Sequence, residues 1–337
     1  MPDRTVRRPT IKDVAERAHV SKSLVSLVLS ESSKVSDKSR AAVLNAIDEL
    51  GYRPSAAARS LVTGRTNTVA VIMSDPQHGM NPSVMEGIHT SLSTAGMDAL
   101  IMYGHRDERR ESEIVESFLE LRADAFIFLG SVMPREQLTE LGGQIPVVVV
   151  GRRMPAEGFD VVAADSFAGA VLAVEHLIGL GHHRIGHIDA TLSRAEPQCL
   201  AGYRATMAAH DLEGNSVTGS LLQDGGESGA RLLLEQDGEF PTAIFAASDL
   251  AALGARDVIR AAGFSIPDRV SLVGYGDSSF ARLHDIELTS VREPTEAMGI
   301  YAAEVAVNRI LDPTEPPSEW IAAPELVVRG STVPPAA

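Results

Sequence analysis

The stretch TIKDVAERAHVSKSLVSLVL, residues 10–29, decides the fold of the amino-terminal end of the chain. Apolar residues recur at helical spacing over residues 11–18 and again over residues 24–29. Between the two runs, His19 stands where the turn needs a left-handed backbone, and Ser21 is a typical N-cap. The stretch therefore predicts two short helices joined by a tight turn.

A third helix is expected after this pair, with Ser36 as its N-cap and Gly51 as its left-handed stop. Such a trihelical unit is typical of helix-turn-helix proteins, in which the N-terminal end of the second helix enters the major groove of DNA. The residues expected to contact DNA in this unit are Thr10, Ser21, Lys22, Ser23, Ser26, Leu27 and Ser36. On this pattern alone, a purely structural helical bundle is the alternative.

Charge is distributed unevenly along the chain. Residues 1–66 hold 12 lysines and arginines against 7 aspartates and glutamates, a net charge of +5 within a total of -15. The remainder therefore has a net charge of -20. All four lysines lie between Lys12 and Lys38. A basic end attached to an acidic body favours contact of DNA with the amino-terminal unit alone.

A resemblance to the LacI family covers residues 10–66. It rests on the runs TIKDVAERAHVSKSLVSLVLSESSKVSDKSR and YRPSAAARSLVTGRT. In that family the residues matching Lys22, Ser23 and Leu27 read the major groove, and the last is commonly arginine. The resemblance implies that Leu27 makes an apolar contact with a thymine methyl group in place of a contact with guanine.

Residues 55–66 form the expected hinge and linker. The run PSAAARSL is too short to be a stable helix alone in water, so by itself it predicts a flexible linker. The resemblance implies instead that the segment folds on the operator and that Leu61 wedges between base pairs from the minor groove. The expected DNA contacts of the hinge are Ala56, Ala58, Arg59 and Leu61.

From Val69 onward, short β-branched runs alternate with helical segments. The expected strands are residues 68–74, 98–103, 125–130, 146–151, 184–189, 243–248 and 270–275. This alternation predicts an α/β fold whose parallel strands are covered by helices on both faces. The run VVAADSFAGAVLAVEHLIGLGHHRIGHID and the tail PELVVRGSTV also resemble the LacI family, so the resemblance spans nearly all of the chain.

The resemblance implies a two-lobed, doubly wound core like that of periplasmic binding proteins, behind a small all-α headpiece. The chain is expected to pass between the lobes near residues 163, 291 and 322. The expected domains are a headpiece at 1–54, a hinge at 55–66 and an effector-binding and dimerisation core at 67–337. The expected lobes of the core are residues 67–163 with 292–322, and residues 164–291 with 323–333.

Ligands of open α/β sheets bind beyond the carboxyl ends of the strands. The candidate effector-binding residues at such positions are Asp75, Asn81, Ser83, Ser193, Cys199, Ser248, Asp249, Gly276 and Asp277. Sugar-binding and purine-binding members of the family usually have an aromatic ring in place of Ser83, and an arginine and an aspartate in place of Cys199 and Gly276. These departures predict an effector that is neither a free hexose nor a purine base. Drift at positions that no longer matter is the alternative.

The sequence gives little support for an enzymatic or metal-binding function. It contains no glycine-rich phosphate loop and no GxSxG motif, so neither a cofactor nor an enzymatic role is expected. His182, His183 and His187 are interpreted as a solvated turn followed by a core histidine, so no metal site is expected. The single cysteine is interpreted as a small residue that is buried or half-buried, with redox sensing as the alternative. Glu111 is interpreted as part of an exposed helix face.

The sequence has no apolar segment long enough to cross a bilayer and no apolar run after its charged first residues, so we expect a cytoplasmic protein. We interpret the chain as a sequence-specific transcriptional regulator and, within that class, as a repressor. On this interpretation a homodimer or higher oligomer binds a pseudo-palindromic DNA operator, and a small-molecule effector of unknown identity controls its affinity. The rival interpretations are a solute-binding protein and a Rossmann-type enzyme, which the headpiece and the missing cofactor loop disfavour.

Overall fold

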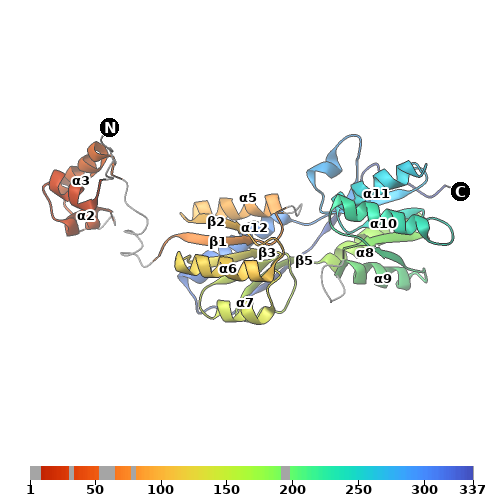
Figure 1. Ribbon diagram of the computed structural model, residues 1–337, viewed down its shortest axis with the longest axis horizontal. Coiled ribbons are helices and arrows are strands. Elements are labelled where there is room, and N and C mark those ends of the chain that lie inside the picture. The colour runs from red at the N-terminus through yellow and green to blue at the C-terminus, as the bar shows by residue number, and fades with distance from the viewer. Residues whose placement is uncertain (1–8, 30–33, 53–64, 77–80, 191–197, 337) are drawn as a thin grey trace, which may run out of the picture. The chain divides into compact units, whose positions relative to one another are not determined.

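The computed structural model describes residues 9–29, 34–52, 65–76, 81–190 and 198–336. The chain divides into two compact units, Met1–Thr68 with Arg122–Asp124 and the remainder of the chain. The second unit contains two sheets, each covered by helices (Figure 1). No helix in the described part of the chain combines the length and the apolar character that crossing a membrane requires.

Three helices form the headpiece, as the sequence predicts: α1 (Ile11–Arg17), α2 (Lys22–Leu29) and α3 (Asp37–Leu50). His19 has a φ of 54° and Gly51 a φ of 59°, so both adopt the left-handed backbone expected of them. Ser21 Oγ accepts a hydrogen bond from the Leu24 amide at 3.2 Å, which confirms its role as a cap. The buried core of the headpiece consists of Val14, Ala15, Val25, Val28, Val35, Val43, Ala46 and Tyr52.

The first sheet has six strands in the order β11-β5-β4-β3-β1-β2. They are β1 (Thr68–Met73), β2 (Asp98–Tyr103), β3 (Ala125–Leu129), β4 (Val147–Val150), β5 (Asp160–Ala164) and β11 (Glu319–Ala322). The helices of this lobe are α5 (Asn81–Thr94), α6 (Glu108–Glu120), α7 (Arg135–Gly142) and α12 (Thr295–Leu311). The pairings from β11 through to β1 are parallel. Figure 1 shows α5 on one side of this sheet and α6 and α7 on the other.

The second sheet has six strands in the order β12-β10-β9-β8-β6-β7. They are β6 (Ile185–Asp189), β7 (Asn215–Thr218), β8 (Ala243–Ala246), β9 (Ser271–Tyr275), β10 (Thr289–Arg292) and β12 (Glu325–Val327). The helices of this lobe are α8 (Ser166–Gly179), α9 (Gln198–Ala209), α10 (Gln223–Glu235), α11 (Asp249–Ala261) and the 3-10 helix η1 (Ser279–Arg282). All pairings in this sheet are parallel except that of β10 with β12. The helix pairs α8–α9 and α10–α11 cover its two faces (Figure 1).

Three very short crossovers join the two lobes. Asp165 alone separates β5 from α8. Glu293 and Pro294 separate β10 from α12, and Ala323 and Pro324 separate β11 from β12. Since each crossover has one or two residues, the carboxyl end of the first sheet is tied closely to the second lobe.

All seven expected strands are present, with ends within two residues of the expected ones. The sequence reasoning missed β5, β7, β10, β11 and β12. Most of these are strands of three or four residues, and β7 and β10 read NSVT and TSVR. Such segments lack the continuous apolar run that marks a buried parallel strand.

Glu111 is fully buried, so its interpretation as part of an exposed helix face was wrong. Its carboxylate accepts a hydrogen bond from Ser131 Oγ at 2.7 Å and another from the Val132 amide at 3.2 Å. Both donors lie in the loop that follows β3. Because this loop is about 20 residues away in sequence, no local pattern reveals its contact with Glu111.

His182 is also buried, so its interpretation as part of a solvated turn was wrong. Its Nδ1 lies 2.9 Å from Thr242 Oγ1, and its Nε2 lies 3.1 Å from Ser271 Oγ and 2.9 Å from the Val333 carbonyl oxygen. The imidazole therefore ties the carboxy-terminal tail to the second sheet.

Asp160 is expected to be essential for the stability of the first lobe. Its buried carboxylate accepts hydrogen bonds from Arg309 Nε at 2.8 Å and from the Ser318 amide at 2.7 Å. Asp160→Ala leaves the largely buried Arg309 without its counter-charge, so we expect the free energy of unfolding to fall by about 3–5 kcal/mol. Urea denaturation measures the change. Glu113→Ala, which removes an exposed ion pair with Arg109, is the control and should cost less than about 1 kcal/mol. A loss for Asp160→Ala as small as the control would contradict this account.

The tail contact predicts a pH dependence of stability. Burial lowers the pKa of His182 below its ordinary value, and burial also lowers the pKa of His176. At these histidines the unfolded chain binds protons more readily than the folded protein does. The free energy of unfolding should therefore reach its full value above about pH 6.5 and fall as the pH drops below that value. His182→Gln should reduce the slope below about pH 6.5, whereas the control His89→Gln, at an exposed position of the first lobe, should not reduce it. Equal slopes in the wild type and His182→Gln would rule out this role.

Candidate DNA-binding surface and effector site

Helix α2 presents a polar face and buries an apolar one. Val25 and Val28 pack in the headpiece core. Ser21, Lys22, Ser23 and Leu27 are exposed, and Ser26 is half-buried. Leu27 keeps 39% of its surface exposed, although it is apolar. The exposed face of α2 thus contains the predicted base-contacting residues.

The other predicted contacts of the headpiece secure helix starts. Thr10 donates from its amide and its hydroxyl to Asp13 Oδ2, both at 2.7 Å, at the start of α1. Ser36 Oγ accepts from the Ser39 amide at 3.3 Å at the start of α3. The N-terminal ends of helices carry a partial positive charge that favours phosphate. The predicted hinge contacts Ala56, Ala58, Arg59 and Leu61 lie outside the described residues.

The linker is anchored where β1 begins. Asp124 Oδ2 accepts hydrogen bonds from the Thr66 amide at 3.1 Å and from the Thr68 amide at 3.2 Å. Thr66 Oγ1 donates to the Arg122 carbonyl oxygen at 2.8 Å. These bonds fix the end of the chain segment that leads out of the headpiece.

In the second lobe, Ser248 and Asp249 follow β8 and begin α11. Ser248 Oγ caps this helix by accepting from the Ala251 amide at 3.0 Å. Asp249 is buried, and its carboxylate accepts from Ser290 Oγ and from the Ser278 amide, both at 2.6 Å. Burial raises the pKa of Asp249, although these hydrogen bonds oppose the shift. Both side chains therefore have structural partners in this lobe.

Asp277 follows β9 and has no exposed side-chain surface. Its carboxylate pairs with Arg292 Nε at 2.7 Å, with Arg329 Nη2 at 2.5 Å and with Arg282 Nη2 at 3.0 Å. Burial acts to raise the pKa of Asp277, but hydrogen bonds from Arg292 and Arg329 lower it overall. Because three arginines already occupy this carboxylate, we leave Asp277 out of the proposed effector contacts. The neighbouring Gly276 has a φ of 115°.

A polar group that the sequence reasoning missed surrounds Cys199 at the carboxyl edge of the second sheet. Tyr275 ends β9, and its hydroxyl donates to Glu293 Oε1 at 2.8 Å. Burial, followed by the charge of Glu293, raises the pKa of Tyr275 well above its ordinary value. Burial, followed by the charges of Asp189 and Glu293, raises the pKa of the half-buried Cys199 thiol. A protonated thiol at this position is not activated as a nucleophile.

Tyr275 and Glu293 are therefore added to the candidate effector site. The only sequence signal for Glu293 is that it directly follows the end of β10. Since β10 was not predicted, Glu293 was not identified. Tyr275 ends an expected strand, and the rule for ligand sites points to the residues that follow a strand and not to its last residue.

In the first lobe, Asp75 follows β1 and lies 3.6 Å from Arg106 Nη1. Ser83 is exposed near the start of α5, and Asn81 begins that helix. Two arginines that follow β4 lie at the same edge: Arg152 donates to the Met133 carbonyl oxygen at 2.6 Å, and Arg153 lies 3.9 Å from Asp165. Ser193 lies outside the described residues.

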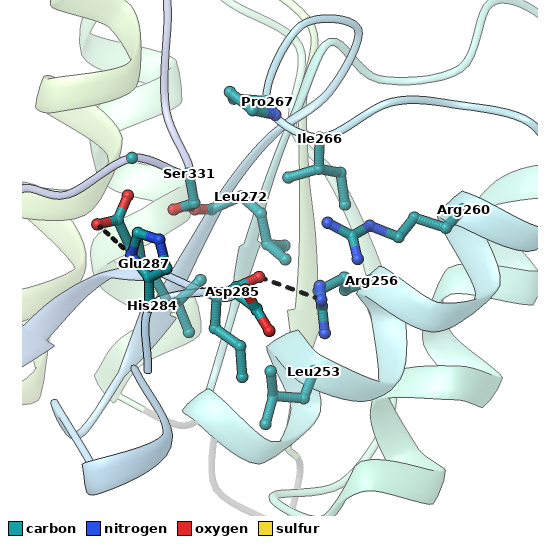
Figure 2. Close-up of a pocket in the computed structure, with 13 residues that line it drawn as sticks. Leu253, Arg256, Arg260, Ile266, Pro267, Leu272, His284, Asp285, Glu287 and Ser331 are labelled. Atoms are coloured by element: carbon teal, nitrogen blue, oxygen red, sulfur yellow. Dashed lines mark hydrogen bonds and ion pairs between the residues drawn. The ribbon is translucent and has the colours of Figure 1, made fainter. Parts of the chain in front are cut away.

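A separate pocket of about 160 Å³ lies against α11 and the carboxy-terminal tail of the second lobe (Figure 2). Arg256 and Arg260 point toward it from α11, and Arg256 Nη2 donates to the Asp285 carbonyl oxygen at 3.3 Å. Among the described residues, its lining includes none of the predicted effector contacts.

Comparison with known proteins adds to this geometry. Residues 10–55 match the model of bacterial regulatory proteins of the lacI family, and residues 174–332 match that of periplasmic binding protein-like domains. The chain is 34% identical over 332 residues to the HTH-type transcriptional regulator GalR of Salmonella typhimurium, covering 97% of this chain and 96% of that one.

Two solved structures share the fold over nearly the whole chain. A complex of the transcriptional regulator CelR with cellobiose is 32% identical, with a TM-score of 0.72, and covers 96% of this chain and 100% of that one. The lac repressor dimer bound to operator and the anti-inducer ONPF is 23% identical, with a TM-score of 0.86, and covers 97% of this chain and 100% of that one.

The exposed Leu27 predicts the base preference of the headpiece. An apolar side chain favours the methyl group of thymine, whereas arginine at this position would favour guanine through two hydrogen bonds. We expect Leu27→Arg to change the preferred base at one position of each half-site from thymine to guanine, by about 1–3 kcal/mol. Selection from random-sequence DNA with both proteins measures the preference. Lys22→Ala is the control and should weaken binding without exchanging thymine for guanine there. An unchanged base preference in Leu27→Arg would contradict the assignment.

Proposed function

The chain belongs to the lacI family of bacterial regulatory proteins and is a DNA-binding transcriptional regulator, and on this premise we propose that it is a homodimeric repressor controlled by a small-molecule effector. The observation that carries the proposal is the exposed face of α2, with Lys22, Ser23 and Leu27, in a basic headpiece attached to an acidic body. Its relatives are regulators and not enzymes. Since operator DNA lies in the bacterial cytoplasm, we place the protein there.

The proposed homodimer is supported by an apolar edge of the first sheet. The strand β2 is the last of its sheet, yet Leu100, Ile101 and Tyr103 are 43%, 44% and 46% exposed. An uncovered apolar edge strand of this kind is prone to association unless a partner covers it. A second copy of the chain would cover this edge and bring two headpieces to the two halves of a pseudo-palindromic operator.

We propose that the effector binds at the carboxyl edges of the two sheets. The proposed contacts are Asp75, Asn81, Ser83, Ser193, Cys199, Ser248, Asp249, Gly276, Tyr275 and Glu293. The half-buried Tyr275 and Glu293 can exchange hydrogen bonds with the hydroxyl groups of a saccharide. The relative CelR was solved with cellobiose, which makes a disaccharide a natural first candidate. The departures at Ser83, Cys199 and Gly276 favour a saccharide other than a free hexose.

The DNA-binding half of the proposal is tested by selection from random-sequence DNA with the full-length protein. We expect the selected sites to be pseudo-palindromic, with two half-sites one helical turn or a multiple of it apart. Binding should weaken steeply as salt is raised, because lysines and arginines of the headpiece release counterions from phosphates. Selected sites with a single half-site and no symmetry would contradict the homodimer.

The effector half is tested by thermal shift of the full-length protein with cellobiose, other disaccharides, pentoses, hexoses and nucleobases. We expect a saturable shift with a saccharide that is not a free hexose, and the same compound should change operator affinity. Tyr275→Phe and Glu293→Gln should each weaken its binding by about 0.5–1.5 kcal/mol, while Tyr301→Phe, in the first lobe, should not. A free hexose or a purine that gives both effects would overturn this assignment.

A further inference from the structure

Two of the three crossovers meet the second lobe at one charged rung. β10 ends at Arg292 and β12 begins at Glu325, and these two residues face each other on the antiparallel ladder. Arg292 Nη1 donates to Glu325 Oε1 at 2.8 Å. Beyond this rung the crossovers consist of Glu293–Pro294 and Ala323–Pro324. The ion pair therefore marks the point at which both crossovers join the second lobe.

The same guanidinium reaches the proposed effector edge. Arg292 Nε donates to Asp277 Oδ2 at 2.7 Å, so one side chain bridges Asp277 and Glu325. Asp277 has a φ of 42° and follows Gly276, whose φ is 115°. A non-glycine residue in the left-handed region needs support from its surroundings. β10 supplies it, because the Asp277 amide donates to Ser290 Oγ at 3.0 Å.

The first of these crossovers has a second link to that edge. Glu293, which lies within the crossover, accepts a hydrogen bond from the Tyr275 hydroxyl at the end of β9. A ligand that contacts Tyr275 or the Gly276 turn would therefore act on groups that are bonded directly to the crossover and to its bordering rung.

The Asp277 cluster also contains an internal control. Arg282 pairs with the same carboxylate at 3.0 Å, but it belongs to η1 and borders no crossover. Its side chain is 60% exposed. Arg282 and Arg292 thus share a partner and a charge and differ in whether they reach Glu325.

We propose that Arg292 is a positioning residue for the regulatory response. Through its bonds to Asp277 and Glu325 it keeps the last pair of residues of β10 and β12 together. Hinge motion is thereby confined to the two short crossovers that contain Pro294 and Pro324. The final rung of a ladder is where local opening begins. If it opens, the hinge lengthens into β10 and β12, and a change at the effector edge is no longer transmitted to the first lobe as a defined movement. This inference rests on the proposed function, because it assumes that lobe movement changes operator affinity.

The test uses full-length Arg292→Gln and Glu325→Gln, their double variant, and Arg282→Gln as the matched control. Hydrogen–deuterium exchange is measured at the amides of residues 291–293, 295, 323 and 325–327. We expect exchange there to rise about tenfold in Arg292→Gln, which loses its contacts with both Asp277 and Glu325, and about threefold in Glu325→Gln, which loses only an exposed ion pair. Exchange should stay near the wild-type rate in Arg282→Gln. Exchange in β6 and β8 should be unchanged. Glu325→Gln leaves the pairing of Asp277 with Arg292 in place, so it tests the rung without disturbing the buried carboxylate.

Operator affinity on the selected DNA site is the readout that a merely structural ion pair would not move. We expect Arg292→Gln and Glu325→Gln to shift the Kd in the same direction by about fivefold or more, with the double variant no further shifted than the larger single one. The melting temperatures of Glu325→Gln and Arg282→Gln should stay close to that of the wild type.

The inference is overturned if Arg282→Gln matches Arg292→Gln in exchange and affinity, if exchange rises throughout the second sheet, or if neither quantity changes. A wild-type protein that binds no selected DNA site would instead refute the proposed function. The exchange comparison would still decide whether the rung borders the hinge.

Discussion

Parallel strands must all end at the same edge of their sheet, and in this chain that constraint operates twice. It brings together side chains from distant parts of the sequence, such as Arg153 and Asp165 after β4 and β5, and Tyr275 and Glu293 after β9 and β10. The three crossovers also leave from strand ends, with only one or two residues each. The edges that can bind a ligand are therefore the edges at which the lobes are joined. A ligand at such an edge lies close to the segments about which the lobes can move.

Desolvation decides which polar residues at these edges are free to bind a ligand. A buried carboxylate must be paired, because an isolated charge in the interior is too costly. Asp277 meets this requirement with three arginines and is therefore left out of the proposed contacts. Asp249 accepts from the Ser290 hydroxyl and the Ser278 amide and pairs with no arginine, so its carboxylate keeps acceptor positions for a ligand. Tyr275 and Glu293 bond to each other and are half-buried, so part of their surface remains open to a ligand. Position in the chain is thus a weaker guide to a binding role than the number of partners a group already has.

Local rules predicted much of the fold, because helix caps and apolar runs act over a few residues. Ser21, Ser36 and Gly51 begin and end the headpiece helices where their chemistry requires, and seven strands follow β-branched runs. Strands such as β7 and β10 are short and polar and exist only because neighbouring strands pair with them. The burial of Glu111 and His182 depends on partners that are distant in sequence, Ser131 and Val333. The same limit hid Glu293, whose place at the site follows from β10.

The headpiece and the body have opposite net charges, which restricts DNA contact to a small unit with few contacts of its own. Such a unit gains affinity and specificity when two copies bind one duplex together. The most direct test of this account is the mass of the complex that the full-length protein forms with its selected duplex, measured by sedimentation at several protein concentrations. The account predicts two chains on one duplex, with no stable complex of one chain at lower concentration. A stable complex of one chain per duplex that binds as tightly would contradict it.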